Sequence, residues 1–306
     1  MKIVLIIFLF IAFASFSMEE IESFGRNDGN LKMFIHVPSN VSKKSDVVIV
    51  LHGCNQTAKE VASQSGWNEL SDKLGFIVIY PQQRVVNNSS KCFNWFLTKD
   101  TSFENGELSS IINMLDFTVL IYSLESPREY IYGLSAGAAM ATTILATYPK
   151  RFQAGASLAG GPVGYADNGI KAFKMMNNPP DFSISEWGSY LPKVKVDQLP
   201  LLIVVHGKED RVVDFSNCNQ LKKQWLSCLN GSEVVVAEST IGTIKRSEYK
   251  SEESTTVITY EIPGLGHKLP VNPGMSEEQG GEEGRYAKDV DFFSTYYIAK
   301  DFGLIP

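Results

Sequence analysis

The pentapeptide Gly133-Leu-Ser-Ala-Gly137 constrains the fold of this chain more than any other segment. It fits the pattern G-x-S-x-G, in which a serine stands on a sharp turn between a strand and a helix, with its hydroxyl exposed above a sheet. Such a turn strains the serine backbone and crowds its neighbours, which favours glycine on both sides. Glu129 to Gly133 predicts a short strand, and Ala138 to Tyr148 predicts a helix of small and apolar residues. We therefore predict that Ser135 is a nucleophile held at a strand-to-helix turn.

Two later segments place an acid and a histidine just beyond predicted strands. Leu201 to His206 predicts a strand that is followed by Asp210, and Thr255 to Ile262 predicts a strand that is followed by His267. Open α/β sheets carry their chemistry at the carboxyl ends of strands. We predict that His267 accepts the serine proton and that Asp210 orients the imidazole. Asp214 is the alternative acid, although it lies farther from the strand end.

A third strand end supplies candidate donors for an oxyanion. Asp46 to Leu51 predicts a buried strand that runs into His52 and Gly53. A glycine here lets the backbone approach a substrate oxygen closely. The N–H groups of Cys54 and Ala136 are the predicted oxyanion donors. The alternative is a strand-to-helix turn with no catalytic role.

The chain suits one large α/β domain, residues 18–306, because 306 residues with 44% hydrophobic content can bury a sizeable core. Residues 160–200 break the alternation of strands and helices and are rich in Gly, Asn, Pro and aromatic residues. This stretch is either an insertion that lines a substrate cleft or a surface excursion whose aromatic rings pack on the body.

The N-terminus predicts a secretory signal at residues 1–17. Lys2 precedes an apolar run of about 14 residues, too short to span a bilayer comfortably, and we expect cleavage after Ser17. The alternative is an uncleaved anchor. We expect a secreted protein, extracellular or periplasmic, with no membrane contact after the signal is removed. The net charge of −6 argues against nucleic acid or anionic membrane partners.

Export makes the four cysteines candidates for disulfides, with three possible pairings. Cys54 and Cys92 each follow a predicted strand, in loops at the predicted active edge, so a bridge between them would brace the oxyanion loop. Cys218 lies in the predicted helix Phe215 to Leu226 and Cys228 follows it, so the two can pair only if that helix ends early, because ten helical residues span roughly 15 Å. The spacing typical of zinc ligands is absent, and we expect no metal and no cofactor.

Five blocks of sequence resemble one known family, the poly(3-hydroxybutyrate) depolymerase family of esterases within the α/β-hydrolases. They are Leu51-His-Gly-Cys-Asn-Gln-Thr57 with Gly66-Trp-Asn68, Gly75-Phe-Ile-Val-Ile-Tyr-Pro-Gln-Gln83, Cys92-Phe-Asn-Trp-Phe96, Gly133 to Met140, and Gly264-Leu-Gly-His-Lys-Leu-Pro-Val-Asn-Pro-Gly274 with Gln279. The resemblance implies a mostly parallel, doubly wound sheet with helices on both faces. It also implies the triad Ser135, Asp210 and His267, and an acyl site lined by Trp95 and its neighbours, with Gly53 and Asn94 as further substrate-binding residues.

The resemblance implies a serine esterase that hydrolyses esters of short 3-hydroxyalkanoates, as polyester or oligoester, through an acyl-enzyme. A feruloyl or acetyl esterase of plant polysaccharide is the nearest alternative, and a non-catalytic polymer-binding protein is an alternative of another class. Two departures stand out. Gly280 and the segment 291–294 replace a cysteine pair of similar family members. We also expect no separate substrate-binding module, and hence weak attack on crystalline polymer.

Overall fold

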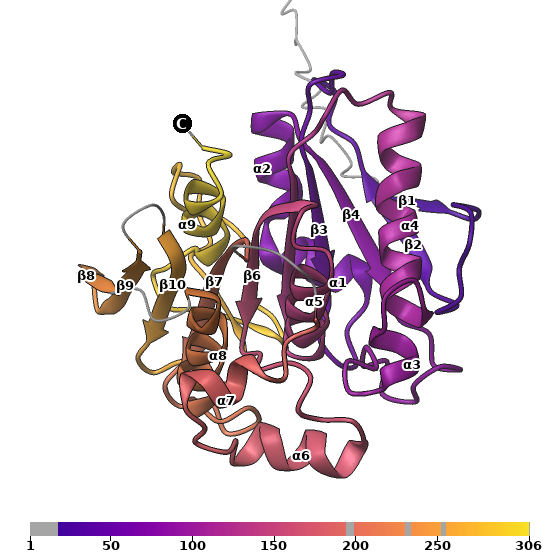
Figure 1. Cartoon of the computed structure of the whole chain (residues 1–306). Coiled ribbons are helices and arrows are strands. Elements are labelled where there is room, and N and C mark those ends of the chain that lie inside the picture. Colours follow the sequence, from indigo (N-terminus) through magenta and orange to yellow (C-terminus); the bar gives the residue numbers. More distant parts are fainter. Residues whose placement is uncertain (1–17, 194–198, 230–233, 252–254, 306) are drawn as a thin grey trace, which may run out of the picture.

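The computed structural model describes residues 18–193, 199–229, 234–251 and 255–305. The predicted signal segment, residues 1–17, lies outside the described residues. In the described part, ten strands form one sheet in the order β1-β2-β4-β3-β5-β6-β7-β10-β9-β8 (Figure 1). They are β1 (Glu19–Ile21), β2 (Lys32–His36), β3 (Val47–Leu51), β4 (Ile77–Gln82), β5 (Glu129–Leu134), β6 (Phe152–Leu158), β7 (Leu201–Gly207), β8 (Val235–Ile241), β9 (Ile244–Lys250) and β10 (Thr255–Ile262).

The central part of the sheet is parallel and both of its edges are antiparallel. β4, β3, β5, β6, β7 and β10 pair in parallel. β1 and β2 add an antiparallel edge on one side, and the hairpin β8–β9 adds one on the other. A small second sheet pairs β11 (Leu269–Val271) with β12 (Ala287–Asp289). The α/β-hydrolase fold expected from the sequence is therefore confirmed.

Helices cover both faces of the sheet because the central strands are apolar on both sides. In β3 the side chains of Val48 and Val50 pack with α1, α2 and α9, whereas Val47, Ile49 and Leu51 pack with α4, α5 and α8. A strand buried on both faces shows a continuous apolar run rather than an alternating one. The helices are α1 (Ala58–Ser65), α2 (Trp67–Leu74), α3 (Thr98–Thr101), α4 (Gly106–Ile121), α5 (Ala136–Thr147), α6 (Gly169–Asn177), α7 (Ile184–Gly188), α8 (Ser216–Leu226), the 3₁₀ helix η1 (Ser227–Leu229) and α9 (Ser294–Asp301).

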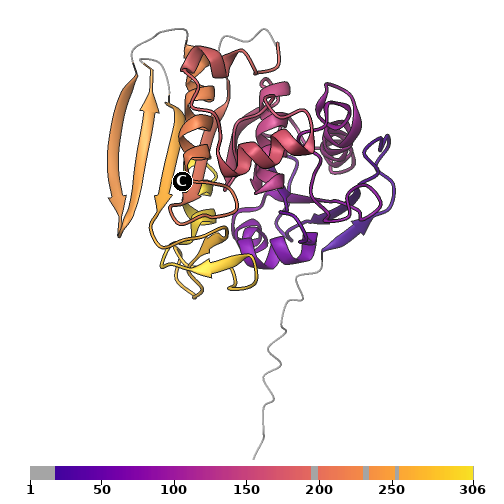
Figure 2. The same cartoon turned by 90° about the horizontal axis from the view of Figure 1, so that it is seen from below.

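Strand register brings distant loops together at the carboxyl edge of the sheet. Leu51 of β3 pairs with Gly133 of β5, so the loop after β3 starts beside the serine turn. Gly207 of β7 pairs with Ile262 of β10, so the loops that follow these two strands also start side by side. This edge is the lower end of the molecule in Figure 1, and Figure 2 shows α6 lying across it. The register thus sets the positions of the three loops predicted to carry chemistry.

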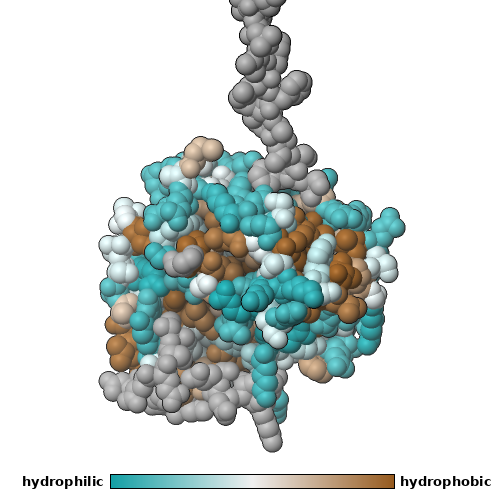
Figure 3. Space-filling view, turned by 90° about the horizontal axis from the view of Figure 1, so that it is seen from above, coloured by the Kyte–Doolittle hydropathy of each residue, from teal (hydrophilic) through white to brown (hydrophobic). Residues whose placement is uncertain are grey.

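The opposite end carries the amino ends of the parallel strands. Figure 3 shows apolar side chains reaching the surface there between hydrophilic ones.

No helix among the described residues is long and apolar enough to cross a membrane.

Candidate active site

The serine turn has the geometry that the pentapeptide predicts. Ser135 lies between β5 and α5 with φ 56° and ψ −119°, a strained conformation for a residue other than glycine. A side chain at Gly137 would place its Cβ 2.5 Å from the carbonyl oxygens of Leu51 and His52, and one at Gly133 would meet the Gly137 carbonyl. Both glycines are therefore needed for β3, β5 and α5 to approach one another.

The structure brings Ser135, His267 and Asp210 into one hydrogen-bonded chain. The Ser135 hydroxyl lies 2.8 Å from Nε2 of His267, and Nδ1 of His267 lies 2.7 Å from Oδ2 of Asp210. Because the carboxylate accepts from Nδ1–H, Nε2 is left free to receive the serine proton. The three side chains follow β5, β7 and β10, which are separate in sequence but meet at one edge.

Asp210 is a buried carboxylate surrounded by donors. Its Oδ1 accepts the N–H groups of Val212 and Val213, each at 2.9 Å, and its Oδ2 lies 3.5 Å from Nε2 of His206. Burial would raise the pKa of Asp210, but the hydrogen bonds from His206 and His267 outweigh burial and hold this pKa well below its usual range. The Asp210 carboxyl is therefore charged at neutral pH, the state in which it accepts from Nδ1–H of His267.

Asp214 lies in a different place and has another role. Its carboxylate accepts the N–H of Ser216 at 2.9 Å, at the first turn of α8. Its own N–H donates to the carbonyl of Met176. The choice between the two acids follows from the turn after β7, which keeps Asp210 at the sheet edge and sends Asp214 into the start of the helix.

His52 fixes the loop that carries the first predicted oxyanion donor. Its Nε2 accepts the N–H of Gln83 at 3.0 Å, so Nδ1 carries the proton and donates to the carbonyl of Gly53 at 2.7 Å. In a trans peptide the C=O and the following N–H point in opposite directions. The bond to Gly53 therefore turns the N–H of Cys54 away from His52. Burial lowers the pKa of His52 to about 4, which keeps the ring neutral.

The two predicted oxyanion donors share one pocket with the serine. Ala136 is the first residue of α5, so its N–H lies in the turn whose N–H groups have no partner within the helix. Cys54 and Ala136 both line the pocket that contains Ser135. The structure joins Cys54 to Cys92 by a disulfide, and the N–H of Asn55 donates to the Ser90 carbonyl at 2.7 Å. The loop after β3 is thus tied to the loop after β4.

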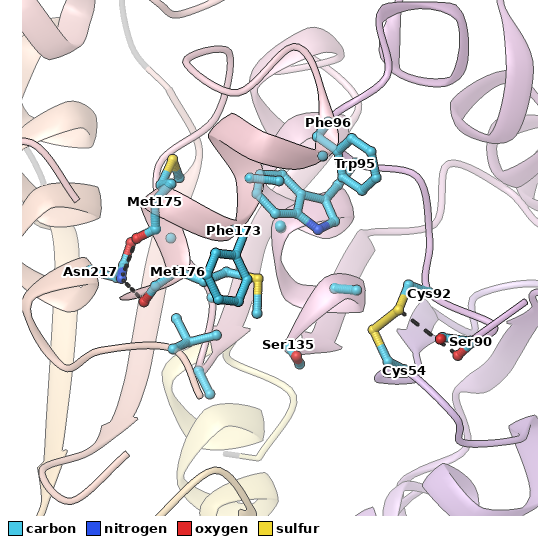
Figure 4. Close-up of a pocket in the computed structure, with 18 of the residues that line it drawn as sticks. Cys54, Ser90, Cys92, Trp95, Phe96, Ser135, Phe173, Met175, Met176 and Asn217 are labelled. Carbon is cyan, nitrogen blue, oxygen red and sulfur yellow. Dashed lines mark hydrogen bonds between the residues drawn. A yellow bond between two sulfur atoms is a disulfide. The ribbon is translucent and has the colours of Figure 1, made fainter. Parts of the chain in front are cut away.

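The pocket is a largely apolar cavity of about 320 Å³ with Ser135 on its wall. Figure 4 shows the disulfide to the right of Ser135 and Phe173 with Met176 to its left. Trp95 and Phe96 lie above the serine in the same view. Helix α6, which forms one wall, is hydrogen-bonded to α8. The buried amide of Asn217 in α8 donates to the carbonyls of Met175 and Met176 in α6, at 3.1 Å each. Further lining residues include Ala139, Ala159, Gly160, Gly161, Gly169, Ala172 and Val213.

Of the three residues predicted to bind substrate, only Trp95 lines this pocket. Asn94 is buried, and its amide donates to Glu107 at 2.6 Å. Gly53 donates its N–H to Gln56 Oε1 at 2.7 Å and is buried as well. Asn94 and Gly53 are therefore not part of the pocket lining, and their predicted substrate contacts stay a prediction. Both residues shape the loops behind the pocket, since their polar groups are already bonded within the protein.

The other two cysteines stay apart. Cys218 is buried within α8 and Cys228 lies beyond it in η1, and both thiols are free. The helix runs to Leu226, so it does not end early enough to let the two thiols meet. Among residues 18–193, 199–229, 234–251 and 255–305, no group of His, Cys, Asp and Glu side chains has the arrangement of a metal site.

Gly280, one of the two places at which the resemblance leads one to expect a cysteine, packs against an aromatic ring. A Cβ at Gly280 would stand 2.6 Å from the ring of Phe293, which is itself 1% exposed. Any side chain at Gly280 would therefore displace this ring.

Sequence patterns do not identify three residues that support the site. The sequence places His206 only in a strand, and Gln83 only in a block of the family resemblance. Glu107 is a buried carboxylate in the first turn of α4, beside the loop of Trp95. The one signal for Glu107 is a single acid at the start of a strongly apolar helix. Its partners, Gln83 and Asn94, are identified only by the folded structure.

Comparisons with known proteins show which proteins this chain is similar to. The family profile described as "Esterase PHB depolymerase" matches residues 32–249. The chain is 38% identical over 300 residues to poly(3-hydroxyalkanoate) depolymerase C of Paucimonas lemoignei, covering 95% of this chain and 71% of that protein. It is 28% identical over 266 residues to feruloyl esterase B of Talaromyces stipitatus, covering 84% and 73%. The structure of an acetyl xylan esterase from Aspergillus awamori shares the fold, with a TM-score of 0.77 and 22% identity, covering 94% of this chain and all of that one.

Proposed function

Because this chain belongs to the PHB depolymerase family of esterases and is a carboxylic ester hydrolase, we propose that it cleaves esters of short 3-hydroxyalkanoates with Ser135 as nucleophile. One observation carries the proposal. The Ser135 hydroxyl is hydrogen-bonded to His267, and His267 to the buried Asp210, beside an apolar pocket. The 38% identity to a poly(3-hydroxyalkanoate) depolymerase supports the substrate class.

The reaction follows from the distances within the triad. Ser135 Oγ attacks the ester carbonyl carbon while Nε2 of His267, 2.8 Å away, takes the serine proton. Asp210 stabilises the imidazolium that forms. The negative charge that develops on the carbonyl oxygen is bound by the N–H groups of Cys54 and Ala136. His267 then protonates the departing alkoxide, and a water activated by the same histidine releases the acid from the serine.

The pocket suits a short acyl group. Its volume of about 320 Å³ is at the low end of small-molecule sites, and its lining is mostly apolar. Trp95, Phe173 and Met176 provide surfaces for the methyl group and the methylene of a 3-hydroxybutyryl unit.

Feruloyl or acetyl esterase activity is the second candidate. Relatives named feruloyl esterase B and acetylxylan esterase match 84% and 90% of the chain at 28% identity. The aromatic wall of Trp95 and Phe96 would also accommodate the phenyl ring of a ferulate ester. Only a direct comparison of substrates separates these activities.

A substrate panel tests the proposal. Initial rates are measured on 3-hydroxybutyrate trimer and tetramer, amorphous polyhydroxybutyrate, methyl ferulate, acetylated xylan and p-nitrophenyl acetate, with Ser135→Ala as the blank. We expect the highest kcat/KM on the hydroxybutyrate oligomers. Higher values on ferulate or acetylxylan would replace the proposed substrate, and equal rates for Ser135→Ala would remove the proposed nucleophile.

We further propose that residues 1–17 are a secretion signal and that 18–306 form the mature catalytic domain. The Cys54–Cys92 disulfide supports an oxidising compartment, since such bonds are rare in the cytosol. N-terminal sequencing of the protein recovered from the medium or periplasm should start at residue 18. Full-length protein retained in the cytosol with free thiols at Cys54 and Cys92 would contradict this assignment.

A further inference from the structure

Glu107 is a buried carboxylate that the ester-cleaving reaction does not use. It lies in the first turn of α4 with 1% of its surface exposed. A buried charge is costly unless donors surround it. Its partners therefore indicate why the side chain is there.

One set of contacts fixes the loop that carries Trp95. Glu107 Oε2 accepts the backbone N–H of Asn94 at 2.8 Å, and Oε1 accepts the Asn94 side-chain amide at 2.6 Å. Asn94 immediately precedes Trp95, which lines the pocket. Since both its backbone and its side chain are bonded to one carboxylate, the direction of the chain entering Trp95 is set by Glu107.

A second set of contacts leads to the loop after β3. Gln83 Nε2 donates to Glu107 Oε1 at 2.5 Å and to the Cys92 carbonyl at 3.2 Å. The N–H of Gln83 donates to Nε2 of His52, whose Nδ1–H holds the Gly53 carbonyl. Two residues, Gln83 and His52, thus connect Glu107 to the peptide that presents the Cys54 N–H.

The partners of Glu107 donate to both of its oxygens. Asn94 and Gln83 contribute only N–H donors to it. A glutamine at position 107 would turn its NH₂ group toward an N–H group of Asn94 or Gln83. Two N–H groups cannot bond to each other, because neither is an acceptor. Burial disfavours the charge most, repulsion from the nearby acid Asp100 adds to it, and the donors are what favour the carboxylate.

We propose that Glu107 is a positioning residue that holds the Trp95 wall directly and the oxyanion loop through Gln83 and His52. The inference rests on the proposed function for its kinetic consequences. Its structural content, the restraint on Trp95, is independent of which ester is cleaved.

The test compares Glu107→Gln with Glu129→Gln. Glu129 is also a buried glutamate, but Arg151 pairs with it at the start of β5, about 20 Å along the strand from Ser135. Both variants lose a buried carboxylate and some stability. Only Glu107→Gln should lower kcat/KM on the hydroxybutyrate trimer, by about ten- to hundredfold, with a larger rise in KM for the trimer than for p-nitrophenyl acetate. Titration with a phosphonate that labels the active serine corrects for inactive protein.

Fluorescence provides a readout that does not depend on catalysis. Of the four tryptophans, Trp67, Trp187 and Trp225 are fully buried, and Trp95 is partly exposed. Acrylamide quenching of the accessible emission therefore reports Trp95. It should increase in Glu107→Gln and in Asn94→Ala but not in Glu129→Gln, and Asn94→Ala serves if Glu107→Gln does not fold.

The outcomes separate the two proposals. Equal quenching and equal KM changes in Glu107→Gln and Glu129→Gln would overturn the positioning role. A wild-type protein that cleaves no ester of the panel would end the proposed function, whereas the quenching comparison would still decide the role of Glu107.

Discussion

The imidazole of His52 donates to the carbonyl of its own neighbour, Gly53, over 2.7 Å. This short-range bond fixes the peptide that links Gly53 to Cys54 and so aims the Cys54 N–H. Oxyanion donors are effective because they are held in place before the charge develops. In the proposed reaction this bond would link a buried, non-reacting histidine to the rate of the chemical step.

Replacing His52 by Phe should lower kcat about ten- to hundredfold while KM changes little. The aromatic ring can still pack against Phe93, as His52 does at 4.9 Å, but the two hydrogen bonds are lost. Steady-state kinetics with p-nitrophenyl acetate measure the effect. A change confined to KM would show that the oxyanion loop does not depend on this bond.

The same histidine should make stability depend on pH. Burial lowers its pKa from 6.5 to about 4, so the unfolded chain binds a proton between these values that the folded chain does not. The free energy of unfolding should therefore fall as pH drops from 6.5 toward 4, by up to about 3 kcal/mol from this group. Urea unfolding of wild type and His52→Phe across this range should show a steeper loss in the wild type.

Glu107 should act in the opposite direction. Burial raises its pKa from 4.5 to about 7, so the folded chain holds a proton that the unfolded chain releases. Its contribution to stability is present below pH 4.5 and is lost as pH rises through 7. The unfolding free energy of wild type relative to Glu107→Gln should consequently fall between pH 4.5 and 7. A difference that rises over this range would contradict the assignment.

The two candidate acids should separate by kinetics and stability. Asp210→Asn should reduce kcat by roughly 10⁴-fold, because the imidazole loses the acceptor that fixes its tautomer. Asp214→Asn should leave kcat nearly unchanged and cost about 1 kcal/mol or less of stability, because its carboxylate only accepts the N–H of Ser216 at the start of α8. The reverse order of the two effects on kcat would make Asp214 the catalytic acid.

Opening the Cys54–Cys92 bridge should weaken both stability and turnover. The bond spans 38 residues, for which chain entropy gives about 4 kcal/mol. Cys54→Ser with Cys92→Ser should lower Tm and kcat together, because the loop after β3 loses its tie to the loop after β4. Cys228→Ser, which removes a free thiol, is the control and should change neither. A double variant with wild-type kcat would show that the bridge does not support the oxyanion loop.

The local elements and the serine turn follow from the sequence alone. Glu129 to Gly133 and Leu201 to His206 are predicted as strands and lie in β5 and β7, because their apolar and β-branched residues suit a buried sheet. The spacing of glycines around Ser135 predicts the sharp turn, because close backbone approach requires them. These are short-range effects, and neighbouring residues are enough to specify them.

Which distant side chains meet is set by the folded chain as a whole. Asp210 and Asp214 both follow the same strand, and the turn after β7 brings the first to His267. The sequence predicts that Asn94 binds substrate, yet its amide is bonded to Glu107, thirteen residues away. Such choices depend on strand register and on which buried donors and acceptors can satisfy one another, because an unpaired polar group is costly in the core. That condition involves the whole packed fold, and no local pattern in the sequence contains it.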